Sequence, residues 1–82
     1  MAKQTKGTGD RHPEIIKIGN RLRELRKELG YESAEKFAWE NKINRVQYWR
    51  MENGQNFTLE SLFKVLDAME TSFQTFVGGI EK

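Results

Sequence analysis

Apolar residues recur along this chain at the spacing of an amphipathic helix, and no stretch of more than four residues alternates like a β-strand. The clearest run has intervals of three and four residues and consists of Ile15, Ile18, Leu22, Leu25 and Leu29. Pro13 suits the first turn of a helix, and Gly30 suits its end. The pattern predicts a helix over residues 13–29 and points to an all-α fold.

Two short helices are predicted next, separated by only a few residues. Ser33 is a good N-cap for a helix that runs to Asn41, and Asn44 is a good N-cap for a helix that ends at Asn53-Gly54. The side chains expected to turn inward are Ala34, Phe37, Ala38, Tyr48 and Met51. This pair of helices has the separation of a helix-turn-helix unit.

Two more helices complete the prediction. One begins after Thr58, and its apolar residues with helical spacing are Leu59, Leu62, Phe63, Leu66 and Met69. The last begins after Ser72, has one or two turns and ends at Gly78-Gly79. Its apolar side chains are Phe73, Phe76 and Val77. The chain is therefore expected to be a compact five-helix bundle.

The length of 82 residues allows one domain at most. Small, polar and basic residues at the start offer no apolar anchor, so residues 1–12 are expected to be a flexible basic arm. Residues 13–77 form the predicted helical domain, and residues 78–82 a flexible tail.

Several classes of function are excluded by composition. The chain has no cysteine and one histidine, His12, which excludes a disulfide framework, a thiolate nucleophile and a zinc site. No nucleophile elbow or phosphate-binding glycine loop is present, so we expect neither an enzyme nor a cofactor or metal. Apolar runs are too short to span a membrane, which predicts a soluble, cytoplasmic protein with no membrane partner.

The charge is distributed unevenly. Residues 1–30 carry eight basic and four acidic groups, residues 31–56 four of each, and residues 57–82 two and four. A basic amino-terminal part on a chain of net charge +2 is typical of a polyanion-binding face with a separate end for self-association, although a solvated surface can also have this distribution.

The order and spacing of several motifs resemble the Cro and lambda-repressor-like (XRE-type) helix-turn-helix domains, over about residues 15–77. The matching segments are Arg21-Leu22-Arg23-Glu24-Leu25-Arg26, Phe37-Ala38, Ile43-Asn44-Arg45-Val46-Gln47-Tyr48, Glu52-Asn53-Gly54, Leu59-Glu60-Ser61-Leu62 and Leu66. The chain departs from the family at Lys42, where the turn glycine is common, at Ala34, often a polar DNA-contacting residue, and at Trp49, usually small or polar. The resemblance implies a DNA-binding domain, and it pairs Arg26 with Glu52 as a structural salt bridge.

Within this framework the helix after Asn44 is the predicted recognition helix, about residues 44–53. Arg45, Val46 and Arg50 occupy its first, second and sixth positions and share its outward face. Arginine can fork onto guanine O6 and N7, and valine can pack on a thymine methyl group. The residues predicted to read bases are Asn44, Arg45, Val46, Gln47 and Arg50. Those predicted to contact the DNA backbone or its periphery are Ser33, Ala34, Lys42, Trp49, Gln55 and Asn56.

A homodimer is also expected. One recognition helix reads only a few base pairs, and two-fold pairing doubles the contacts. Phe73, Phe76 and Val77 lie in a helix too short to bury all of them against its own domain, so they are the predicted dimer residues, unless both phenylalanines complete the monomer core.

The sequence thus predicts a sequence-specific double-stranded DNA-binding regulator of transcription, with repression favoured, acting in the bacterial cytoplasm at the nucleoid. One alternative is an antitoxin-type interaction module that binds a toxin partner as well as DNA. Another is a binder of RNA or single strands, for which Trp49 beside Arg50 is the only support.

Overall fold

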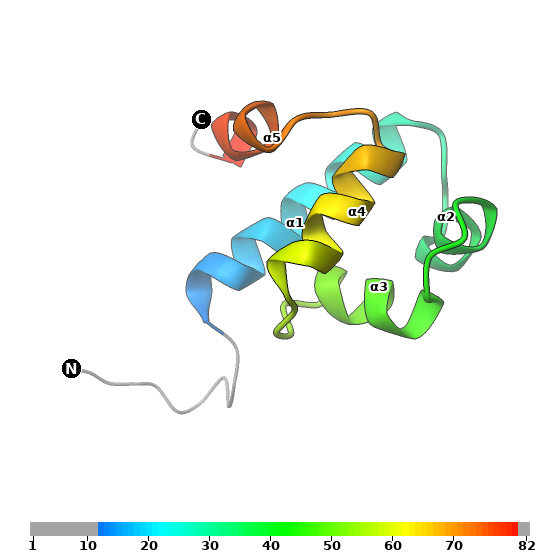
Figure 1. Cartoon of the computed structure of the whole chain (residues 1–82), viewed down its shortest axis with the longest axis horizontal. Helices are drawn as coiled ribbons and strands as arrows, with labels where there is room; N and C mark the ends of the chain where they lie inside the picture. The colour runs from blue at the N-terminus through cyan, green and yellow to red at the C-terminus, as the bar shows by residue number, and fades with distance from the viewer. Residues whose placement is uncertain (1–11, 81–82) are drawn as a thin grey trace.

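Five helices make up the part of the chain that the computed structural model describes, residues 12–80. They are α1 (Pro13–Glu28), α2 (Ala34–Glu40), α3 (Arg45–Glu52), α4 (Leu59–Ala68) and α5 (Phe73–Ile80). Figure 1 shows α3 and α5 on opposite sides of α1 and α4, with α2 beside α3. The predicted all-α, five-helix architecture is confirmed over this range, and the predicted arm residues 1–11 and tail residues 81–82 lie outside it. No helix in residues 12–80 has the length and apolar character needed to cross a membrane.

Side chains cap the helices as the sequence predicts. At the start of α2, the Ser33 hydroxyl accepts from the Lys36 backbone N–H at 3.0 Å. The same arrangement begins the other three helices whose caps were predicted, at Asn44, Thr58 and Ser72. His12, the last residue of the predicted arm, is the N-cap residue of α1. Its Nδ1 accepts from the Glu14 N–H at 3.0 Å and caps α1.

The turn between α2 and α3 depends on a left-handed residue. Lys42 stands where a glycine was expected from the family pattern, and it has φ of 60°. The next residue, Ile43, donates its N–H to the Ala38 carbonyl at 2.8 Å and so closes the turn. The short connection brings α2 and α3 against each other, as a helix-turn-helix requires.

The core lies between α1, α3 and α4, with contributions from α2 and α5. Its buried apolar residues are Leu22, Phe37, Ala38, Tyr48, Met51, Leu62, Val65, Leu66, Met69 and Phe76. The inward orientation predicted for Tyr48 and Met51 is confirmed. The stripe predicted for α4 is partly wrong, because Val65 is buried while Leu59 and Phe63 are exposed. The side of α4 that faces the core is therefore rotated about the helix axis from the predicted side. Leu59 and Phe63 remain exposed to solvent.

The end of α5 differs from the prediction. The helix continues through Gly78 and Gly79 to Ile80, so these glycines neither end it nor belong to a flexible tail. Packing against α1 explains the difference, because a Cβ at Gly79 would lie 2.6 Å from a guanidinium nitrogen of Arg21. Tertiary contact here outweighs the low helix propensity of glycine.

Candidate nucleic-acid interface

A close approach between α1 and α3 sets the position of the predicted recognition helix. Gly19 is buried on α1, against the last turn of α3. A Cβ at this residue would clash with the carbonyl oxygens of Met51 and Glu52, lying only 2.7 Å from the second. Only glycine allows the two backbones to pack at this separation.

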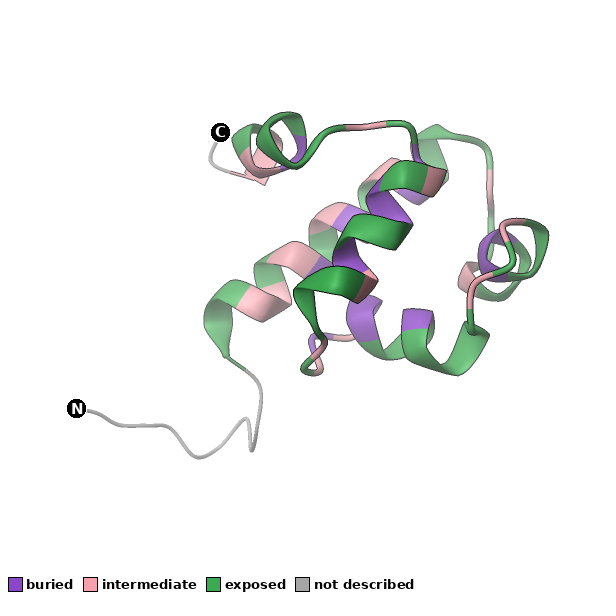
Figure 2. Cartoon of the chain, in the orientation of Figure 1, coloured by how far each residue is buried: buried purple, intermediate pink, exposed green. Residues whose placement is uncertain are grey.

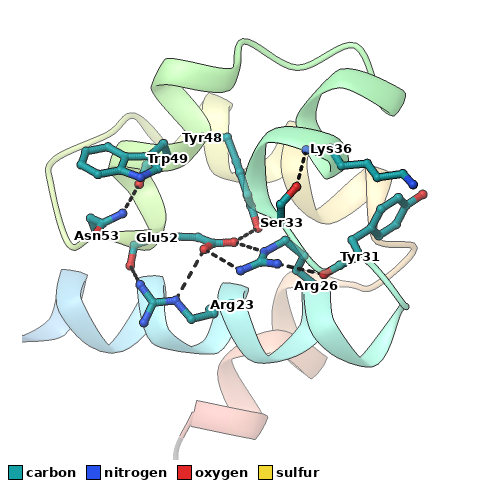
Figure 3. Close-up of polar contacts among 9 residues, drawn as sticks. All are labelled: Arg23, Arg26, Tyr31, Ser33, Lys36, Tyr48, Trp49, Glu52 and Asn53. Carbon is teal, nitrogen blue, oxygen red and sulfur yellow. Dashed lines mark hydrogen bonds and ion pairs between the residues drawn. The ribbon is translucent and has the colours of Figure 1, made fainter.

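A buried ion pair fixes the same end of α3, as the family resemblance implied (Figure 3). Arg26 Nε donates to Glu52 Oε2 at 2.6 Å, and its Nη2 donates to Oε1 at 3.2 Å. Arg26 and Glu52 are 5% and 4% exposed. The remaining Arg26 nitrogen, Nη1, donates to the Tyr31 carbonyl at 2.8 Å, and the Tyr48 hydroxyl donates to Glu52 Oε2 at 2.5 Å. The pair thus has the additional hydrogen bonds that a buried salt bridge needs.

Two pKa values reflect this network. The Glu52 carboxylate accepts from the Arg26 guanidinium and holds the pKa of that arginine above its ordinary value, against the opposing effect of burial. Burial is the main cause that raises the pKa of Tyr48, and the hydrogen bond to Glu52 raises it further. Both effects favour the protonated groups that donate to Glu52.

The opposite, outward face of α3 carries the predicted base-reading side chains. Arg45, Val46 and Arg50 are all exposed, as their spacing predicts. Figure 2 shows that α3 has exposed stretches between its buried ones. Val46 and Trp49 expose 54% and 53% of their surface. The face therefore combines two guanidinium groups with two apolar surfaces.

Arg45 is not isolated on this face. Its Nη1 forms an ion pair with Oε2 of Glu35 on α2, and both side chains remain about two-thirds exposed. These two residues, with Val46 and Trp49, line a shallow hollow of about 340 Å³. Glu35 is a candidate site residue that the sequence analysis missed. Its ten-residue separation from Arg45 gives no helical signal, since the contact depends on how α2 crosses α3.

The other predicted contact residues have mixed positions. Lys42 and Asn56 are exposed in the loops that flank α3, and Gln55 is partly exposed. Ala34 is half-buried against the core, so it offers no polar side chain to a ligand. Gln47 is exposed, but its amide nitrogen donates to the Ser61 hydroxyl of α4 at 2.5 Å.

Asn44 and Ser33 are already engaged as caps, because Asn44 Oδ1 accepts from the Gln47 N–H at 2.8 Å. Arg23 was quoted only as part of a motif, yet it contributes to the network around Glu52. Its Nε lies 3.6 Å from Glu52 Oε1, and its Nη2 donates to the Glu52 carbonyl at 3.4 Å. Its place three residues before Arg26 on α1 was the signal for this role.

The predicted dimer residues are divided by the structure. Phe76 is 1% exposed and belongs to the core, so its assignment to a dimer surface is wrong, and Val77 is half-buried. Phe73 is exposed and packs edge-to-face on Phe63, with ring centroids 5.6 Å apart. With Leu59 these two residues form an exposed apolar patch, which we call the α4–α5 patch.

Comparison with known proteins places this geometry among related chains. Control protein C.MunI of Mycoplasma sp. is 35% identical over 68 residues, which cover 82% of this chain and 92% of that protein. The crystal structure of the restriction-modification controller protein C.AhdI from Aeromonas hydrophila matches with a TM-score of 0.69 and 30% identity, covering 79% of this chain and 98% of that one. No family model matches the chain.

A third likeness concerns the fold alone. The controller protein C.Esp1396I, in a tetramer in complex with its natural 35 base-pair operator, matches with a TM-score of 0.73 and 23% identity. The match covers 84% of this chain and 91% of that one.

Proposed function

This chain belongs to the family of restriction-modification controller proteins, and we propose that it is a sequence-specific double-stranded DNA-binding regulator of transcription. In this proposal α3 enters the major groove of an operator, and the genes under control belong to a restriction-modification system. Repression is the mode of regulation that we propose, and the protein would act in the bacterial cytoplasm at the nucleoid.

The observation that carries the proposal is the outward face of α3. Arg45 and Arg50 present guanidinium groups at two positions of one exposed helix face, and Val46 lies beside Arg45. Guanidinium forks match the O6 and N7 acceptors of guanine, and Val46 matches the methyl group of thymine. The Arg26–Glu52 pair holds this face in one orientation, which base readout requires.

Surrounding residues supply contacts that position the protein without reading sequence. We propose that Lys42, Gln55, Asn56 and the Ser33 cap contact phosphates. Trp49 and Asn44 border the base-reading residues, and Gln47 reaches the DNA only if it gives up its bond to Ser61.

We also propose that two copies associate through the α4–α5 patch defined above. Helix α5 lies on the other side of α1 and α4 from α3 (Figure 1), and residues 57–82 carry two basic and four acidic groups, so this end is not attracted to DNA. C.Esp1396I binds its operator as a tetramer, which is consistent with association in this fold.

The two alternatives are less well supported. The relatives are controller proteins, and none of their names points to a toxin partner or to catalysis. A binder of single strands would need several exposed aromatic side chains as a platform, whereas Trp49 is the one exposed aromatic side chain that the structure describes on α3.

A selection of bound duplexes from random DNA tests the proposal, followed by titrations on the selected site and on random DNA. Arg45→Ala and Arg50→Ala should each weaken binding to the selected site by about 1 to 3 kcal/mol and binding to random DNA much less. Lys17→Ala is the matched control, since Lys17 is exposed on the side of α1 that lines a hollow with Gly79 and Ile80 of α5. Equal losses on both DNAs would show that the arginines contact phosphates and do not read bases.

A further inference from the structure

The ion pair between Glu35 and Arg45 joins the two helices of the helix-turn-helix. Within residues 12–80 it is the one hydrogen bond that links a side chain of α2 to a side chain of α3. Both side chains are about two-thirds exposed. Exposed ion pairs contribute little to folding stability. The first turn of α2 favours an acidic residue through the helix dipole, but that effect does not require a contact with Arg45.

A carboxylate here is also unfavourable for simple attraction to DNA. Glu35 lies on the face that carries Arg45, and its negative charge offsets the charge that draws this face to phosphates. A surface that served only to bind DNA tightly, without selecting a sequence, would have no acidic residue at this position. The contact therefore makes physical sense if selectivity, and not overall affinity, is what it improves.

The geometry shows how the pair serves selectivity. Only Nη1 of Arg45 is engaged within the described residues, which leaves Nε and Nη2 as donors on the guanidinium. A free arginine side chain loses rotamer entropy when it is fixed, and a bidentate contact needs the planar group in one orientation. Val46 and Trp49 line the same hollow as the two charged side chains.

We propose that Glu35 is a specificity-determining positioning residue, which holds the Arg45 guanidinium in the orientation that reads a guanine. The inference rests on the proposed function, because it concerns how the same α3 face distinguishes bases. It predicts opposite signs for two measurements on Glu35→Gln. Binding to random DNA becomes tighter because a negative charge is lost, while discrimination at one G·C pair becomes weaker.

The experiment uses the full chain, the selected operator and a set of duplexes in which each G·C pair is replaced in turn. Arg45→Ala should abolish discrimination at one G·C pair, a factor of roughly 5 to 150 for a bidentate contact. Glu35→Gln should reduce discrimination at that pair, and at no other, by about threefold or more. Glu40→Gln is the matched control, because it removes the same charge from an exposed position at the end of α2 and should leave discrimination unchanged.

The double variant Glu35→Gln/Arg45→Ala separates positioning from direct contact. If Glu35 acts through Arg45, the double variant should discriminate no worse than Arg45→Ala alone. A further loss in the double variant would show that Glu35 contacts a base itself, for example cytosine N4, and would overturn the proposal. Unchanged or improved discrimination by Glu35→Gln would overturn it as well, while leaving the proposed function intact. If the unaltered chain selects no sequence at all, the proposed function fails first.

Discussion

Lys42 holds a backbone conformation that a residue with a Cβ adopts only with strain. Its φ of 60° lies in the left-handed region, which costs a residue other than glycine roughly 1 to 2 kcal/mol. Lys42→Gly should therefore stabilise the protein by about 0.5 to 1 kcal/mol, once the greater entropy of an unfolded glycine is subtracted. Urea unfolding measures the change.

Lys42→Ala is the control, because it removes the charge but keeps the Cβ. It should show no such gain, and both variants should lose any phosphate contact of the lysine equally. A gain of the same size in both variants would mean that the side chain, and not the turn conformation, is the source.

Tyr48 links stability to alkaline pH. Burial and the bond to Glu52 raise the pKa of its hydroxyl above the usual value near 10. The folded protein keeps this proton at a pH where the unfolded chain has lost it. The resulting stabilisation is complete below about pH 10 and falls by about 1.4 kcal/mol per pH unit as pH rises from there toward the folded-state pKa.

Tyr48→Phe tests this linkage, since it removes the titrating group and keeps the ring. The variant should be less stable than the original chain at neutral pH, because Glu52 loses a hydrogen bond. The difference in free energy of unfolding between the original chain and the variant should become smaller between about pH 10 and about pH 11. Tyr31 is present in both proteins, so it does not contribute to this difference. Parallel stability curves over this range would contradict the assignment.

At the scale of elements, two glycines within helices have opposite surroundings. Gly19 faces backbone carbonyl oxygens of α3 that cannot move aside, whereas a Cβ at Gly78 would meet no atom within 4 Å. Gly19→Ala should destabilise the protein by more than about 1 kcal/mol, because an added methyl group that does not fit typically costs about 1 to 3 kcal/mol. Gly78→Ala should stabilise it by about 0.5 to 1 kcal/mol, through better helix propensity. Thermal unfolding of the two variants measures both effects, and a stabilising Gly19→Ala would refute the close packing of α1 on α3.

The elements also show what sequence can and cannot predict here. Capping residues such as Ser33 and Asn44 act through bonds to neighbours three residues away, so the helix starts followed from local chemistry. The exposure of Arg45, Val46 and Arg50 followed from helical periodicity in the same way. The end of α5 did not, because it depends on the packing of Gly79 against Arg21 of α1.

Contacts between elements account for the other differences. The Glu35–Arg45 pair and the position of Gly19 depend on how helices cross, and no spacing along the chain encodes that angle. Arg26 and Glu52 are 26 residues apart, and only the family resemblance indicated that they would pair. Phe76 was misassigned because periodicity places it on an apolar face of α5 without telling which neighbour covers that face.

For the whole molecule, the α4–α5 patch predicts a homodimer. Phe73 and Phe63 leave 46% and 44% of their surface exposed in the monomer, and an exposed cluster of this kind is typical of an interface. Light scattering at roughly tens of micromolar should give the mass of a dimer, and Phe63→Ser/Phe73→Ser should give a monomer. Trp39→Ser is the control, since Trp39 is 79% exposed on α2 and lies outside the patch. A monomeric original chain, or dissociation by the control alone, would remove the α4–α5 patch as the interface.

The attachment of α3 to α1 has a consequence for the thermodynamics of recognition. Gly19 and the Arg26–Glu52 pair make the two helices one rigid body, so α3 needs no folding or reorientation when a ligand arrives. The heat-capacity change of DNA binding should then match the apolar surface that the interface buries. The larger heat-capacity change that accompanies folding on binding should be absent. The conformational entropy of the recognition helix is lost when the chain folds, and the operator meets a surface that is already in its final shape.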